Sequence, residues 1–153
     1  MTFMTTNPAL ARSLAERDYT NPTPVQLAVL APEAATRDLL VSAQTGSGKT
    51  VAYGLAMAET LLGTEERFAP ATVPQALVVA PTRELALQVQ REFAWLYGAT
   101  GARIISCVGG MDPRMEQRLL NQAAHIVVGT PGRLRGHLVR GSLDISSLRV
   151  VVL

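Results

Sequence analysis

The chain has 153 residues, of which 48% are apolar and 17% are charged, and its formal net charge is +2. This length and apolar content predict one domain with a buried core and exclude an intrinsically disordered chain. No apolar run reaches the roughly 18 residues of a membrane span, and the N-terminus lacks the pattern of a secretory signal. The lone Cys107 excludes an internal disulfide, so we expect a buried, inert thiol in a cytoplasmic protein without a membrane partner.

Helical and strand-like segments alternate along the chain. Helical stretches are expected at about 8–17, 25–35, 51–62, 84–98, 113–123 and 132–139. Between them lie short apolar runs that do not alternate with polar residues, which is typical of strands buried on both faces of a parallel sheet. The runs are Leu39–Val41, Ala76–Ala80, Ile104–Val108, Ile126–Val128 and Val150–Leu153. The pattern predicts an α/β fold with a mainly parallel sheet flanked by helices.

The stretch AQTGSGKT, residues 43–50, lies between an expected strand and an expected helix. That is the setting of a phosphate-binding loop, in which glycines allow a tight turn and the helix start attracts anions. Lys49, the only lysine among fourteen basic residues, suits the β- and γ-phosphates, and the Thr50 hydroxyl suits Mg²⁺. The first position is Ala43 where the usual pattern has glycine. The loop alone leaves the class of enzyme and the base open.

A second segment, YTNPTPVQ at residues 19–26, offers groups that suit a nucleotide base. The amide of Gln26 can pair with the N6 and N7 edge of adenine, and Tyr19 can stack on the ring. An ordinary surface glutamine that opens a helix is the alternative.

Three further segments follow expected strands: PTREL from Pro81, GG at residues 109–110, and TPGRL from Thr130. Because ligands bind beyond the carboxyl ends of parallel strands, we expect all three on one edge of the sheet, where backbone N–H groups and arginines can contact phosphates. Helix caps at the two threonines and a plain glycine turn are the alternatives. His125 and His137 have no cysteine or histidine at metal-ligand spacing, so no metal–histidine site is expected.

In this order and spacing, the segments resemble the first RecA-like domain of the DEAD-box RNA helicases. PTPVQ is similar to the family's Q motif, AQTGSGKT to motif I, PTREL to motif Ia, GG to the GG motif and TPGR to motif Ib. The resemblance implies a three-layer RecA-like P-loop domain, with a Q-motif region at residues 1–36 and a core at 37–153. It also implies ATP with Mg²⁺ as cofactors, RNA as partner, and local unwinding of RNA duplexes.

The resemblance also implies roles for individual residues. Thr23 and Gln26 would recognise adenine, and Tyr19 would lie beside it. Phe3 is offset from the family's upstream phenylalanine, and Asp18 replaces a usual glycine. The triphosphate and Mg²⁺ would be held by Ala43, Gln44, Thr45, Gly46, Ser47, Gly48, Lys49 and Thr50. The RNA backbone would lie along Pro81, Thr82, Arg83, Gly109, Gly110, Thr130, Pro131, Gly132 and Arg133.

The acidic D-E-A-D motif would align directly after Leu153, so the resemblance implies an incomplete domain without motif II, without the second RecA-like domain and with little ATP hydrolysis of its own. Two other readings remain open. One is a different P-loop enzyme, such as a nucleotide kinase or a transporter ATPase, which explains the phosphate loop alone. The other is a non-catalytic module that binds nucleotide or a protein.

Overall fold

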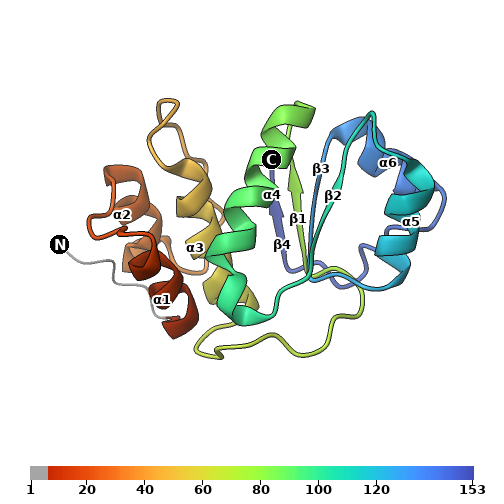
Figure 1. Ribbon diagram of the computed structural model, residues 1–153. Coiled ribbons are helices and arrows are strands. Elements are labelled where there is room, and N and C mark those ends of the chain that lie inside the picture. The colour runs from red at the N-terminus through yellow and green to blue at the C-terminus, as the bar shows by residue number, and fades with distance from the viewer. Residues whose placement is uncertain (1–6) are drawn as a thin grey trace.

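A computed structural model of the chain describes residues 7–153 (Figure 1), so Phe3 lies outside the described residues. Helices and strands alternate along most of the chain. In order they are α1 (Pro8–Glu16), α2 (Pro24–Leu30), the 3₁₀ turn η1 (Pro32–Ala34), α3 (Lys49–Leu61), β1 (Ala76–Val79), α4 (Arg83–Leu96), the 3₁₀ turn η2 (Gly98–Thr100), β2 (Ile104–Cys107), α5 (Pro113–Asn121), β3 (Ile126–Gly129), α6 (Pro131–Val139) and β4 (Val150–Val152).

The strands form one parallel sheet in the order β2-β3-β1-β4. All four residues of β3 are buried, as expected for a strand with neighbours on both sides and helices on both faces. Figure 1 shows α1 to α4 on one side of the sheet and α5 and α6 on the other. The α/β fold predicted from the alternating pattern is therefore confirmed, and four expected strands differ from the observed ones only in their last residue.

A large apolar core joins the sheet to α1, α3 and α4, and a smaller one joins it to α5 and α6. In the larger core α3 and α4 approach closely at Gly54. A Cβ there would lie 2.7 Å from a methyl carbon of Leu96, and the Tyr97 hydroxyl donates a hydrogen bond to the Gly54 carbonyl. These contacts fix the helix that follows the phosphate loop.

The strand expected at Leu39–Val41 is not formed, and this prediction was wrong. The segment has no regular secondary structure, and no described strand pairs with it. Because a strand requires backbone hydrogen bonds to a neighbour, an apolar run without one stays irregular. Leu40 is fully exposed, and the segment lines an apolar hollow with Val25 and Val29 of α2.

Among the described residues, no helix is long and apolar enough to cross a membrane.

Candidate functional site

The phosphate loop leads directly into α3. Gly48, in a left-handed conformation with φ +84°, precedes the first helical residue, and no side chain caps the helix. Gly46 also has positive φ, and a Cβ placed there would meet nothing within 4 Å, so the space beside the loop is open. An uncapped helix start beside an open space is the setting in which backbone N–H groups bind an anion.

Lys49 and Ser47 are partly buried polar residues of the loop, whereas Gln44 and Thr45 are exposed. The Lys49 Nζ donates to the Ala43 carbonyl at 2.7 Å, and the Ser47 N–H donates to the Gln44 carbonyl at 3.2 Å. The Ser47 hydroxyl is buried without a hydrogen-bond partner, which is a costly state for a polar group. Thr45 lies in the turn, and Thr50 lies in the first turn of α3. This donor set, with its one ammonium and one unpaired hydroxyl, fits a phosphate group.

The Q-motif residues pack against this loop. The Gln26 amide oxygen accepts from the Thr23 N–H at 2.9 Å, and its Nε2 donates to the Gly48 carbonyl at 3.2 Å. The Thr23 hydroxyl in turn accepts from the Gln26 N–H, which completes a capping box at the start of α2. A Cβ at Gly48 would collide with the Gln26 amide, so glycine is needed there for space as well as conformation. The structure therefore brings residues 23–26 and 43–50 together.

Gln26 is a buried structural residue in addition to any role with a base. Its side chain is 1% exposed, and both ends of its amide already bind the protein. An amide oxygen has a second lone pair and an amide nitrogen a second hydrogen, so each keeps one position for a ligand. The Tyr19 ring packs on Trp95 of α4 at 5.3 Å between centroids, and its place beside adenine stays a prediction.

The three segments after the strands do meet at one edge of the sheet. The register pairs Val79 with Gly129 and Gly129 with Cys107, so β1, β3 and β2 end side by side. Thr130 follows the end of β3 directly, and Pro81 and Gly109 follow the ends of β1 and β2 after one intervening residue. In Figure 1 the loop before α3 lies at the same upper end of the molecule. The predicted nucleotide loop and the three predicted phosphate-contacting segments thus share one end of the fold.

The segments also contact one another. Gly110 has φ +82°, and a Cβ there would collide with the Arg83 guanidinium, so GG and PTREL are neighbours. Gly109 lines a hollow of about 370 Å³ with residues of the TPGR segment. The other lining residues are Pro113, Thr130, Gly132, Arg133, Gly136 and Arg140. The hollow offers two arginines and exposed backbone, which are groups that bind phosphate.

The helix starts on this edge differ from each other. The Thr82 hydroxyl accepts from the Leu85 N–H at 3.2 Å and so caps α4. Thr130 makes no such bond, and α6 begins with Pro131 and Gly132 without a side-chain cap. Of the two helices α4 and α6, it is therefore α6 that begins with backbone N–H groups that no side chain caps.

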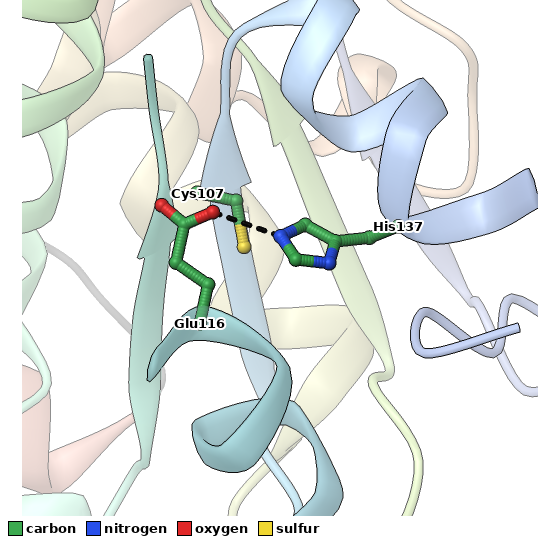
Figure 2. A group of neighbouring side chains, drawn as sticks. All are labelled: Cys107, Glu116 and His137. Carbon is green, nitrogen blue, oxygen red and sulfur yellow. Dashed lines mark hydrogen bonds and ion pairs between the residues drawn. The ribbon is translucent and has the colours of Figure 1, made fainter. Parts of the chain in front are cut away.

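Glu116, which the sequence did not single out, lies under this edge (Figure 2). Figure 2 shows its carboxylate facing the His137 ring of α6, with the side chain of Cys107 of β2 beside the bond that joins them. Oε1 accepts from His137 Nε2 at 2.8 Å and from Arg133 Nη1 at 3.3 Å, and Oε2 accepts from the Val108 N–H at 2.9 Å. A carboxylate at a core-facing position of an amphipathic helix is the sequence signal for such a residue.

Cys107, Glu116 and His137 offer ligand atoms that all lie within 4.8 Å of one another. The sequence did not predict this group, since its members are distant in the chain. Cys107 is buried as expected, and its burial, and then the Glu116 charge, raises the pKa of its thiol to about 12. His125 has a structural role: Nδ1 accepts from the Arg103 N–H, so Nε2 donates to the Ala69 carbonyl.

Arg140 is a second residue that the sequence did not single out. It is exposed and lines the hollow opposite the glycines. It comes seven positions after Arg133 along α6, two helical turns on, and this spacing is the signal that points to the same helix face.

Comparison with known proteins agrees with the resemblance that the sequence motifs indicated. Residues 23–153 match the family model described as DEAD/DEAH box helicase. The chain is 40% identical over 147 residues to "DEAD-box ATP-dependent RNA helicase 9" of Oryza sativa subsp. japonica, and 41% identical over 152 residues to "ATP-dependent RNA helicase DeaD" of Buchnera aphidicola subsp. Schizaphis graminum. These alignments cover 96% and 99% of the chain but only 23% and 24% of the relatives.

A solved structure shares the fold. The crystal structure of a hypothetical ATP-dependent RNA helicase from Sulfolobus tokodaii superposes with a TM-score of 0.80 at 30% identity. The match covers 94% of this chain and 39% of that one. The chain therefore spans about a quarter of the curated relatives and less than half of the solved one.

Proposed function

Because this chain belongs to the DEAD/DEAH box helicase family, we propose that it forms the ATP- and RNA-binding first domain of an ATP-dependent RNA helicase that unwinds short RNA duplexes in the cytoplasm. The main observation behind the proposal is that the predicted phosphate loop and the segments PTREL, GG and TPGR lie at one end of the fold. We assign residues 1–36 to the Q-motif region and 37–153 to the core.

The nucleotide is proposed to bind along the loop and the start of α3. Backbone N–H groups of residues 46–50 hold the phosphates, and the Lys49 ammonium leaves the Ala43 carbonyl to neutralise their charge. The Ser47 hydroxyl gains a partner. The Thr50 hydroxyl is the group placed to bind Mg²⁺, which would offset the phosphate charge. Gln26 and Thr23 read the adenine edge beside the loop, and Tyr19 flanks it.

The RNA backbone is proposed to follow the sheet edge across PTREL, GG and TPGR. Arg83 and Arg140 supply charge, and the uncapped start of α6 supplies backbone N–H groups. These groups contact phosphate and sugar and leave the base edges unread, so binding should be largely independent of sequence.

A nucleotide titration tests the proposal. Mg-ATP at about 100 times its Kd should stabilise the chain by about 2.7 kcal/mol, which raises the Tm by roughly 5–10 °C, and Mg-GTP should do so less. Lys49→Ala should remove the shift while the fold survives, and Arg91→Ala, which removes one exposed charge from α4, should keep it. Equal stabilisation by ATP and GTP would contradict the adenine site, and binding of a small phosphoryl acceptor without RNA would favour a nucleotide kinase.

A further inference from the structure

We propose that Glu116 is a positioning residue: it locks the GG and TPGR segments in one relative placement and so sets the affinity of the edge for RNA. The inference rests on the proposed function for what binds there. It concerns a residue of α5 outside the predicted motifs, whose carboxylate is held by the residue after β2 and by two residues of α6.

The carboxylate of Glu116 joins β2, α5 and α6. One oxygen accepts the N–H of Val108, which directly precedes Gly109. The other accepts from Arg133, the last residue of TPGR, and from His137 one turn later on α6. Arg133 extends the connection, because its Nη2 donates to the Met111 carbonyl at 3.1 Å, on the far side of the glycines. The GG segment is therefore tied on one side by the Glu116 carboxylate and on the other by Arg133, which is itself bonded to that carboxylate.

Burial makes these contacts costly to lose. Glu116 is 3% exposed and the Arg133 side chain 16%, while His137 is fully buried. A buried carboxylate is tolerated only when charged or hydrogen-bonding partners surround it, and removal of one partner leaves the others unpaired. Since Glu116 and Leu120 are the buried residues of α5, the carboxylate occupies a position that an apolar side chain would otherwise fill. A carboxylate at this position therefore fixes the placement of its partners more than it raises the stability of the fold.

The same contacts argue against a metal ion among Cys107, Glu116 and His137. Both carboxylate oxygens already accept N–H groups, and a guanidinium lies 3.3 Å from one of them. A cation would have to displace these donors and stand beside a fixed positive charge. The cluster is thus a hydrogen-bonded clamp.

The clamp acts on the hollow that the two segments share. Gly109, Gly132 and Arg133 line it, and Gly110 needs its left-handed conformation to turn the chain there. Backbone groups bind a phosphate only where they converge on it, and a displacement of about 1 Å costs a large part of such an interaction. When the carboxylate is lost, both segments become free to separate.

Glu116→Gln tests the clamp because general electrostatics and the loss of the clamp predict opposite changes in RNA affinity. The substitution removes a negative charge, so general electrostatics predicts tighter binding of polyanionic RNA. A glutamine keeps an acceptor for the Val108 N–H but meets Arg133 and His137 with an NH₂ group, so the clamp opens at Arg133. We expect RNA affinity to fall by about 3- to 10-fold, with Mg-ATP affinity unchanged. Glu59→Gln, an exposed site on α3 with the same charge change, should not weaken RNA binding.

A double-mutant cycle separates positioning from a general loss of stability. If Glu116 acts through Arg133, Glu116→Gln adds no further loss of RNA affinity in an Arg133→Gln background. Fully additive losses, or RNA binding by Glu116→Gln as tight as by the parent chain, would overturn the proposal.

Amide NMR signals of the chain without RNA give an independent readout. Glu116→Gln should shift and broaden the signals of Gly109 and Gly110 and leave those of Gly46 and Gly48 in place. If the parent chain binds no RNA, the proposed function fails. The clamp is then judged on these signals alone, and unchanged glycine signals would refute it.

Discussion

Gln26 has a structural role in addition to the adenine recognition that we propose for it. It closes a capping box with Thr23 and reaches across to the Gly48 carbonyl, so the start of α2 and the phosphate loop are held together by one amide. Sequence alone identified the residue but not this bond, because Gln26 and Gly48 are 22 positions apart.

Gln26→Ala should have two separable effects. Loss of its buried hydrogen bonds should lower the free energy of unfolding by about 1–2 kcal/mol, as measured by urea denaturation. Loss of the amide should reduce the preference for ATP over GTP more than it reduces triphosphate binding, since we propose that residues 46–50 hold the phosphates. Thr82→Ala, which removes the cap of α4, is the matched control and should leave the preference for ATP unchanged. Equal weakening of both nucleotides would contradict the adenine role.

Sequence reasoning was weakest for buried polar residues. Glu116 escaped notice because a glutamate in a helix is ordinarily exposed, and only the fold shows that this one faces Val108 and His137. Periodicity reports which positions are apolar, whereas the partners of a buried charge come from elements distant in the chain. The same limit explains why the grouping of His137 with Cys107 was missed.

At the scale of elements, the predictions succeeded where a segment carries its own signal. The helices α5 and α6 start at a proline in the first helical position, and β1 to β4 are short aliphatic runs with parallel neighbours. Leu39–Val41 carries the same aliphatic signal but has no described neighbour, so composition alone could not distinguish it from a strand. A segment forms a strand only when it pairs with a neighbouring segment, and the pattern of one segment does not show whether such a neighbour is present.

The irregular state of this segment can be tested by stability. Leu40→Ser should change the free energy of unfolding by less than about 0.5 kcal/mol, because the Leu40 side chain is already fully exposed. Val78→Ala in β1, where valine is 2% exposed, should cost about 1.5–3 kcal/mol. Both values come from urea denaturation of the 153-residue chain. A loss of several kcal/mol in Leu40→Ser would show that the segment is buried.

At the scale of the whole molecule, the location of the charged side chains is more informative than the net charge. A net charge of +2 is too small to identify a partner, yet three arginines lie near the carboxyl ends of the strands. Arg133 is engaged by Glu116 and Met111, whereas Arg83 and Arg140 are exposed. The two exposed arginines should therefore make the salt-dependent part of RNA binding, while Arg133 maintains the shape of the edge.

The salt dependence of RNA binding measures this division directly. Each phosphate neutralised on a single strand contributes a slope of about −0.7 to log K against log salt, so two arginines predict a slope near −1.4 between about 50 and 200 mM KCl. Arg140→Gln should reduce the slope by about 0.7, as measured by fluorescence anisotropy. Arg12→Gln removes the same charge from α1, where Arg12 pairs with Glu66, and should leave the slope unchanged. Because backbone contacts do not read bases, oligouridine and oligoadenosine should give the same slope, and a slope confined to one of them would contradict binding through the phosphates.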